Sequence, residues 1–181
     1  RACERGGRQD GTAAAQVSVT AAADLRFMQL ALTLGRRGLG NTWPNPAVGA
    51  LVVKDGILVG RGWTQPGGRP HAETEALRRA GDQARGATLY VTLEPCSHHG
   101  RTPPCADAIV DAGIARVVSA LGDPNPKVAG DGYARLRAAG IEVSEGLCAK
   151  EARRDHAGHI RRILDGRPHV MLKLAVSADG K

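Results

Sequence analysis

The pattern of apolar and polar residues predicts a chain in which helices and strands alternate. Short apolar runs rich in β-branched residues predict strands, which we expect at 47–53, 57–63, 87–93, 115–121 and 141–145. Helices are expected around them, at 24–34, 71–83, 104–113, 130–139 and 149–164. This order is typical of one mixed sheet with helices on both faces. The predicted fold class is therefore α/β, a three-layer αβα sandwich.

The two ends of the chain set the predicted domain boundaries. Residues 1–23 are rich in alanine, glycine and arginine without periodicity, so we expect a flexible N-terminal extension, with a targeting peptide as the alternative. Residues 24–148 form the predicted domain, and residues 149–167 are expected to be a connector helix. Residues 168–181 are the last predicted segment, in which apolar and polar positions alternate over 169–177 and predict one further strand.

The amino-acid composition limits the kinds of molecule that the chain is expected to bind. The formal charge of +7 fits binding to nucleic acid, binding to an anionic small substrate, or no specific partner. Aromatic residues make up only 3 % of the chain, which argues against nucleic acid, because single-strand binders stack bases on aromatic rings. No run approaches the roughly 18 apolar residues of a membrane span. The four cysteines show no disulfide pattern, so we expect a reducing, cytoplasmic location.

The residues that carry chemistry lie between His71 and Cys105. His71, Cys96 and Cys105 supply an imidazole and two thiols, and Glu73 follows the histidine by two residues. Three protein ligands leave the fourth position of a tetrahedral Zn²⁺ open for water, which is typical of catalytic zinc sites. A neighbouring carboxylate can move the protons of that water. A single histidine or cysteine is more often a buried structural residue, but this combination favours a metal site.

The spacing of these residues predicts where they lie. Side chains two residues apart point roughly 200° apart in the middle of a helix, so His71 and Glu73 can converge only at a helix start. A second helix is expected to begin near Cys105, where the helix N-terminus favours a thiolate. Glu94 is the competing acid or base. It precedes Pro95 at a strand end, so we expect an orienting or structural role for Glu94 and prefer Glu73.

His-x-Glu followed by Pro-Cys and a further Cys is the signature of zinc-dependent nucleobase deaminases. Here eight residues separate Cys96 from Cys105, in place of the two of the common nucleic-acid deaminase motif. This insert, together with Asn-Pro-Ala-Val-Gly at 45–49 and Asp-Pro-Asn-Pro at 123–126, resembles the pyrimidine deaminase domain of the bifunctional riboflavin-biosynthesis deaminase/reductase family. The resemblance extends over roughly residues 24–181.

The resemblance implies a cytidine deaminase-like fold, a Zn²⁺ cofactor and a substrate. That substrate is a diaminohydroxypyrimidine carrying a phosphoribosylamino group, which loses its 2-amino group to give the uracil product. By resemblance, Asn45 binds the base, His98 contacts the substrate, and Arg101 binds its phosphate. Asp123 and Asn125 match ribose and phosphate contacts, with the anionic Asp123 facing hydroxyls. The alternatives are a solvated loop for His98 and Arg101, and turn formation for the others.

The C-terminal residues resemble the start of the family's reductase domain. The resemblance places Ala175 near the NADPH site, but only if a reductase domain is present. Such a domain needs roughly 200 further residues, so we do not expect the reductase step from the given sequence. The resemblance also suggests a homo-oligomer. The segment 155–159 departs from the family's Leu-Asn-x-Gly-Phe, and we expect its His156 and His159 on an exposed connector or interface helix rather than on a metal.

Two other functions remain open on sequence grounds. A tRNA or single-strand nucleic-acid deaminase would share the zinc chemistry, but the scarce aromatics and the long insert argue against it. A non-catalytic, zinc-stabilised module would need no proton carrier, so Glu73 argues against that reading.

Overall fold

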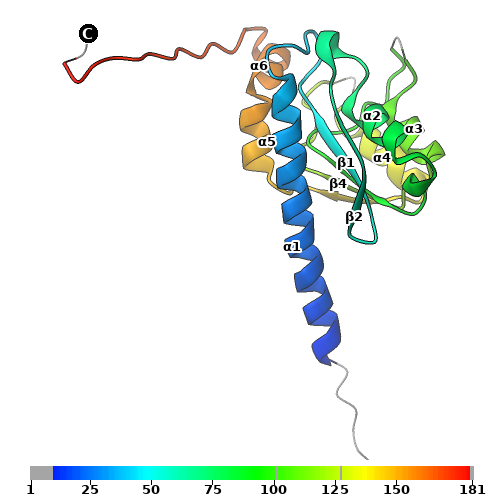
Figure 1. Cartoon of the computed structure of the whole chain (residues 1–181). Helices are drawn as coiled ribbons and strands as arrows, with labels where there is room; N and C mark the ends of the chain where they lie inside the picture. Colours follow the sequence, from blue (N-terminus) through cyan, green and yellow to red (C-terminus); the bar gives the residue numbers. More distant parts are fainter. Residues whose placement is uncertain (1–9, 101, 127, 180–181) are drawn as a thin grey trace, which may run out of the picture.

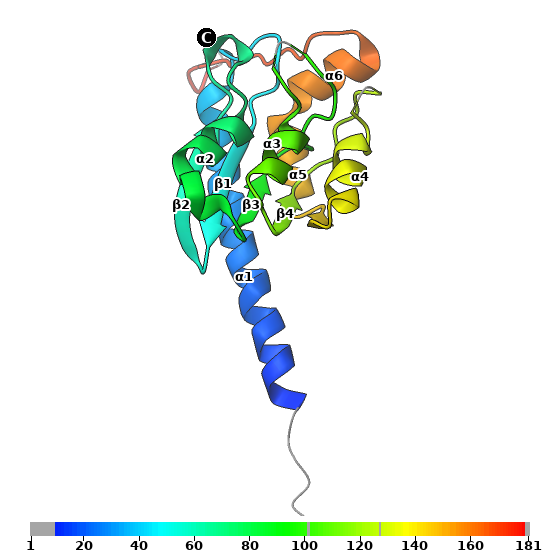
Figure 2. The same ribbon diagram turned by 90° about the vertical axis from the view of Figure 1, so that its right-hand side faces the viewer.

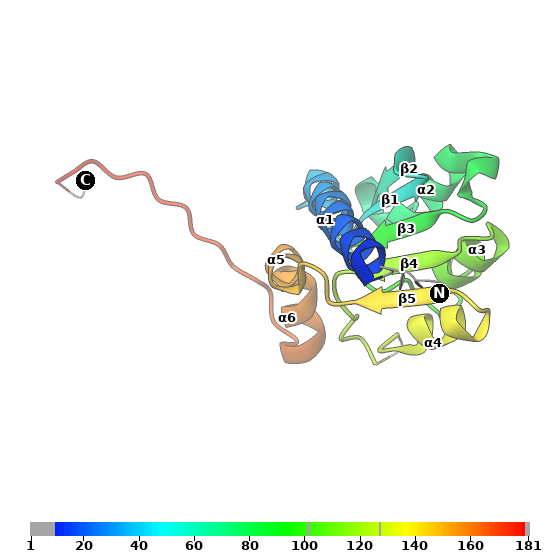
Figure 3. The same ribbon diagram turned by 90° about the horizontal axis from the view of Figure 1, so that it is seen from below.

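The structure is a computed structural model that describes residues 10–100, 102–126 and 128–179. It has three layers, with a central sheet between two groups of helices (Figure 3). The strand order is β2-β1-β3-β4-β5. Strand β1 is antiparallel to β2 and β3, whereas β3, β4 and β5 are parallel. The predicted α/β fold with a mixed sheet is therefore confirmed.

All five strands predicted within residues 47–145 are present. Their bounds are β1 Gly49–Lys54, β2 Ile57–Trp63, β3 Thr88–Val91, β4 Arg116–Ser119 and β5 Glu142–Glu145. Asp55 and Gly56 join β1 to β2 with φ values of 51° and 77°. Two positive φ values suit a tight hairpin turn, which explains the Asp-Gly pair.

Helices cover both faces of the sheet (Figures 1 and 3). Helices α1 and α5 lie on one face, and α2, α3 and α4 lie on the other. Helix α6 follows α5 and lies at the end of the domain opposite the N-terminal part of α1 (Figure 2). The bounds are α1 Asp10–Gly35, α2 Ala72–Ala80, α3 Cys105–Asp111, α4 Asp131–Ala138, α5 Ala149–Asp155 and α6 Ala157–Asp165. Short 3-10 turns lie at Arg36–Gly38, Pro66–Gly68 and Gly81–Ala84.

Helix α2 packs close to β2 because two strand residues have no side chain. A Cβ atom on Gly62 would lie 2.2 Å from the Ala72 carbonyl oxygen, and one on Gly60 would lie 2.2 Å from that of Ala76. Both distances are well inside van der Waals contact, so these positions require glycine. The glycines thus fix the height of α2 above the sheet.

Helix α1 begins earlier than expected. It starts at Asp10 rather than near Asp24, so the expectation that residues 10–23 are not helical is wrong; residues 1–9 lie outside the described part of the chain. Alanine has the highest helix propensity, and these residues are alanine-rich without an apolar stripe. Asp24 lies inside the helix and does not cap it. Its carboxylate accepts hydrogen bonds from Tyr90 Oη (2.6 Å) and Arg116 Nη2 (2.8 Å).

The C-terminal expectations also need correction. The connector is two helices, not one, because the chain leaves helical geometry at His156 (φ −95°, ψ 10°). The strand predicted at 169–177 is not formed. A strand needs a neighbour to pair its backbone hydrogen bonds, and the tail runs away from the domain (Figure 1). Its apolar side chains are exposed, with Val170 at 80 %. No helix in the described residues is long and apolar enough to cross a membrane.

Candidate active site

The candidate site lies where β3 and β4 end and where α2 and α3 begin. This is the carboxyl edge of the parallel strands, at which sites form in open α/β sheets. The chain after β3 carries Cys96, and the chain after β4 carries Asp123. His71 is the N-cap of α2 with extended geometry (φ −69°, ψ 159°), and Glu73 lies in the first turn. The predicted helix start at His71 is confirmed. Cys105 is the first residue of α3, also as predicted.

The three predicted ligands converge on one point. His71 Nδ1 lies 3.3 Å from Cys105 Sγ and 3.7 Å from Cys96 Sγ. All three atoms lie within 4.8 Å of one another. A tetrahedral Zn²⁺ with Zn–S of about 2.3 Å and Zn–N of about 2.05 Å would separate a nitrogen and a sulfur ligand by about 3.6 Å. The donor set and its spacing therefore fit zinc.

Contacts between the two thiols shift their pKa values in opposite directions. The backbone N–H of Cys105 donates to Cys96 Sγ at 3.3 Å. Hydrogen bonds from the Cys105 side chain and from His71 outweigh burial and lower the pKa of Cys96 to about 4. The same contact with Cys96, together with burial, raises the pKa of Cys105 well above its usual value. A dication between them would favour ionisation of both, because metal binding requires thiolates.

The environment of Glu73 raises the pKa of its carboxyl group towards neutral pH. Its side chain is buried, with 4 % of the residue exposed. Burial raises the pKa of Glu73 to about 7, and the charge on Cys96 adds to this while His71 opposes it. A carboxyl group with a pKa near the working pH can both take and return a proton.

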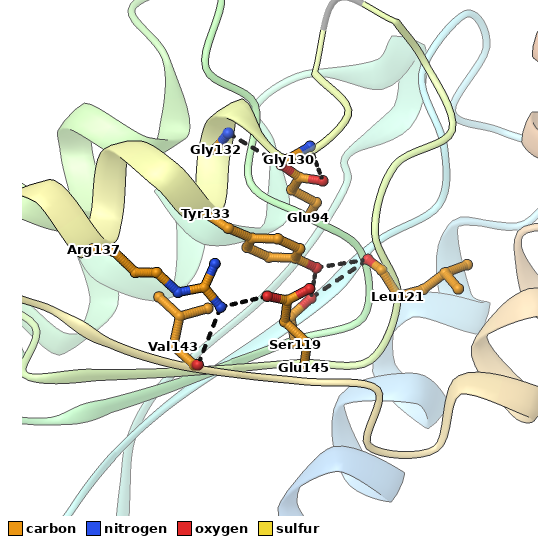
Figure 4. A network of polar contacts seen from close by, with 9 residues as sticks. All are labelled: Glu94, Ser119, Leu121, Gly130, Gly132, Tyr133, Arg137, Val143 and Glu145. Atoms are coloured by element: carbon orange, nitrogen blue, oxygen red, sulfur yellow. Dashed lines mark hydrogen bonds and ion pairs between the residues drawn. The ribbon is translucent and has the colours of Figure 1, made fainter.

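The carboxylate of Glu94 is hydrogen-bonded to backbone N–H groups of the loop before α4 and of the first turn of α4. Its carboxylate accepts the N–H groups of Gly130 (2.9 Å), Gly132 (3.0 Å) and Asp123 (3.2 Å), as Figure 4 shows for the glycines. A Cβ atom on Gly132 would lie 2.1 Å from the Pro95 carbonyl oxygen. These contacts fit the structural role expected for Glu94 and leave Glu73 as the candidate acid and base.

Aromatic and charged residues continue this network beneath Glu94. The Tyr133 hydroxyl lies 2.7 Å from Ser119 Oγ and 3.1 Å from the Leu121 carbonyl oxygen (Figure 4). The guanidinium of Arg137 pairs with Glu145 at the edge of the sheet. The network connects α4 to β4 and β5, so both ends of the loop that carries Asp123 are held in place.

Most of the predicted substrate residues meet in one cavity. It is lined by Asn45, His98, Asp123 and Asn125, together with His71, Glu73 and Cys96. Asn45 Nδ2 donates to the Gly68 carbonyl oxygen at 2.7 Å and lies 3.2 Å from His71 Nε2, so it contacts a candidate metal ligand as well as the cavity. Arg101 lies outside the described residues. Ala175 lies in the exposed tail, so its predicted cofactor role stays a prediction.

The basic residues among the cavity lining that were not predicted number three. Arg69, His159 and Arg162 also line the cavity. Arg69 Nη1 donates to Thr102 Oγ1 at 2.6 Å. The spacing of His159 and Arg162 places them on one helical face, but the sequence does not say what that face covers.

The expectation of an exposed helix for the two histidines is wrong. His156 is 2 % exposed, and its Nε2 lies 3.2 Å from the Thr92 carbonyl oxygen. The His159 side chain is 7 % exposed and contacts Asp123. The bend at His156 turns α6 over the cavity, which a single straight connector helix would not do.

Comparison with known proteins agrees with this geometry. Residues 21–121 match the family described as the cytidine and deoxycytidylate deaminase zinc-binding region. The chain is 56 % identical over 158 residues to the riboflavin biosynthesis protein RibD of Escherichia coli, covering 87 % of the chain and 43 % of that protein. The chain thus spans less than half the length of this relative.

Solved structures give the same picture. RibD of Acinetobacter baumannii (form 1) is 52 % identical, with a TM-score of 0.81 over 87 % of this chain and 44 % of that one. A diaminohydroxyphosphoribosylaminopyrimidine deaminase/5-amino-6-(5-phosphoribosylamino)uracil reductase from Thermotoga maritima is 45 % identical, with a TM-score of 0.82 over 88 % and 46 % of the two chains. The chain therefore belongs to the cytidine and deoxycytidylate deaminase family with a zinc-binding region, and it is a deaminase domain of the RibD kind.

Proposed function

We propose that the chain catalyses the zinc-dependent hydrolytic deamination of 2,5-diamino-6-(5-phosphoribosylamino)pyrimidin-4(3H)-one to 5-amino-6-(5-phosphoribosylamino)uracil and ammonia. The observation that carries the proposal is the convergence of His71 Nδ1 and the sulfurs of Cys96 and Cys105, with buried Glu73 in the same cavity. The names of the RibD relatives support the choice of substrate.

In the proposed reaction, three residues bind the metal and Glu73 transfers the protons. Held by His71, Cys96 and Cys105, Zn²⁺ would lower the pKa of a bound water towards about 7 and supply hydroxide at neutral pH. Glu73 takes a proton from that water and passes it to the ring nitrogen beside the attacked carbon. The hydroxide oxygen bonds to the ring carbon that carries the 2-amino group, and Glu73 moves the remaining hydroxyl proton to that amino group. The carbon–nitrogen bond breaks, ammonia leaves, and the new carbon–oxygen bond becomes the carbonyl of the uracil.

The cavity side chains would orient the substrate. The Asn45 amide can donate to and accept from the pyrimidine edge. We assign His98 to the substrate, Asp123 and Asn125 to the ribose and phosphate, and Arg101 to the phosphate through its bidentate guanidinium. Asp123 and Asn125 come from the loop that Glu94 holds through the backbone N–H groups of Asp123 and Gly130.

An ammonia-release assay with this pyrimidine tests the proposal. Metal-free protein should be inactive, and adding Zn²⁺ should restore activity. We expect Glu73→Gln to keep stoichiometric zinc but to lose about 10²- to 10⁴-fold in kcat, the usual effect of removing a general acid–base group. Parent-level activity in Glu73→Gln would disprove the role of Glu73. Zinc-loaded parent protein that releases no ammonia from the pyrimidine would disprove the reaction.

A further inference from the structure

Helix α6 forms one wall of the cavity and brings His159 against the loop that follows β4. His159 Nε2 lies 3.0 Å from Asp123 Oδ1, and the two side chains are 7 % and 10 % exposed. Both residues line the cavity. Neither belongs to residues 21–121, which match the deaminase family. The pair is thus inside the candidate site but outside its zinc-binding signature.

Asp123 is held from several directions. An ionised carboxylate only accepts hydrogen bonds, so His159 Nε2 carries the proton of their contact. The same oxygen, Oδ1, accepts the backbone N–H of Asn125 at 2.9 Å. The backbone N–H of Asp123 donates to Glu94 Oε2 at 3.2 Å. His159 therefore supplies a side-chain donor that fixes the carboxylate of an already anchored residue.

Two further residues, His156 and Arg162, hold α6 in place. Before the helix, His156 Nε2 lies 3.2 Å from the Thr92 carbonyl oxygen. Three residues after His159, Arg162 donates to the Pro44 carbonyl oxygen at 2.9 Å, and its guanidinium lies over the Trp43 ring. Helix α6 therefore bridges the loop of Asn45 and the loop of Asp123, and both loops line the cavity.

The buried imidazole of His159 is best explained by the hydrogen bond that its Nε2–H group donates to Asp123. Its Nδ1 atom is buried without a hydrogen-bond partner among the described residues. An unpaired buried polar atom destabilises a fold, whereas an apolar ring of similar size would fill the space without that cost. What the imidazole adds at this position is a directed N–H donor to Asp123.

We propose that His159 is a positioning residue, which holds the Asp123 carboxylate in the orientation that receives the sugar hydroxyls of the phosphoribosylated pyrimidine. The inference rests on the proposed function. A carboxylate that is fixed before binding loses little rotational freedom when the substrate arrives. Among the described residues, the side-chain contact of His159 is with Asp123 and not with Glu73 or the candidate zinc ligands. Loss of His159 should therefore act on KM rather than on kcat.

Two substitutions distinguish the effect of the hydrogen-bond donor of His159 from the effect of the ring itself. We expect His159→Phe, which keeps a ring and removes the donor, to raise KM about tenfold, the equivalent of one lost hydrogen bond to a charged group. We expect kcat and zinc content to stay near the parent values. His159→Gln can place an amide N–H on the same oxygen and should recover most of the parent KM. His169→Phe, at an exposed position of the tail, is the matched control and should change nothing.

A double-mutant cycle tests the coupling to Asp123. In an Asp123→Asn background, His159→Phe should add little to the loss already present, because residues that act through one contact are not additive. Fully additive losses would overturn the proposal. So would equal losses in His159→Gln and His159→Phe, or a fall in kcat at unchanged KM. Thermal unfolding of each variant checks that the fold is retained.

A readout that needs no activity tests the contact itself. Nitrogen-15 NMR of the imidazole should show the Nε2–H tautomer for His159, with a shift in Asp123→Asn. An Nδ1–H tautomer, or no response to Asp123→Asn, would overturn the proposal. Parent protein that is inactive on the pyrimidine would instead overturn the proposed function, so the two failures are distinguishable.

Discussion

At the scale of single residues, His156 makes the stability of the fold depend on pH. Burial lowers the pKa of His156 to about 4 from its ordinary 6.5, and the neighbouring His159 adds to this. The unfolded chain therefore binds a proton between pH 6.5 and pH 4 that the folded chain does not. The stability that neutral His156 contributes to the fold is fully present above pH 6.5 and is lost as the pH falls towards 4. At about 1.4 kcal/mol per pKa unit, the free energy of unfolding should fall by about 3 kcal/mol.

Urea unfolding of parent and His156→Gln at pH 7 and pH 4.5 measures this effect. The glutamine amide can still donate to the Thr92 carbonyl oxygen but does not titrate. The variant should therefore lose less stability on acidification than the parent. Protonation of the zinc ligands affects both proteins alike and cancels in the comparison. Identical pH dependence in the two proteins would show that His156 is not the responsible group.

At the scale of elements, the packing of α2 on β2 sets the position of His71, a candidate zinc ligand. A Cβ atom on Gly62 would collide with the Ala72 carbonyl oxygen, and Ala72 directly follows His71. We expect Gly62→Ala to lift the start of α2, lower the free energy of unfolding by about 1–3 kcal/mol, and weaken zinc binding. Competition with a chromophoric chelator measures the zinc affinity. Gly60→Ala is the matched control, because its Cβ would meet Ala76, one turn further along α2. Equal zinc affinity in both variants would contradict this account.

At the scale of the whole molecule, local features were predictable and long-range placements were not. The strands and the start of α2 follow from apolar runs and from the His71–Glu73 spacing, which a few neighbouring residues determine. The position of α6 over the cavity depends on contacts with Thr92 and Asp123, far away in the sequence, so His159 was missed. The tail has the alternation of a strand, but no strand forms without a partner to pair with.

Zinc should couple the separate parts of this fold. His71 precedes α2, Cys96 follows β3 and Cys105 begins α3, so an ion at this point joins three segments. A ligand at about 1,000 times its Kd stabilises the folded state by about 4 kcal/mol. For a domain of this size that corresponds to a rise in Tm of roughly 10 °C.

Calorimetry with and without a chelator measures that rise. The parent should show it and Cys96→Ser should not, because the serine hydroxyl is a poor substitute for a thiolate ligand. Cys148→Ser is the matched control. Cys148 is also a free cysteine, but it does not belong to the ligand group, so its variant should keep the full zinc-dependent shift. An undiminished shift in Cys96→Ser would mean that zinc stabilises the chain from some other site, and the deaminase mechanism built on these three ligands would fail with it.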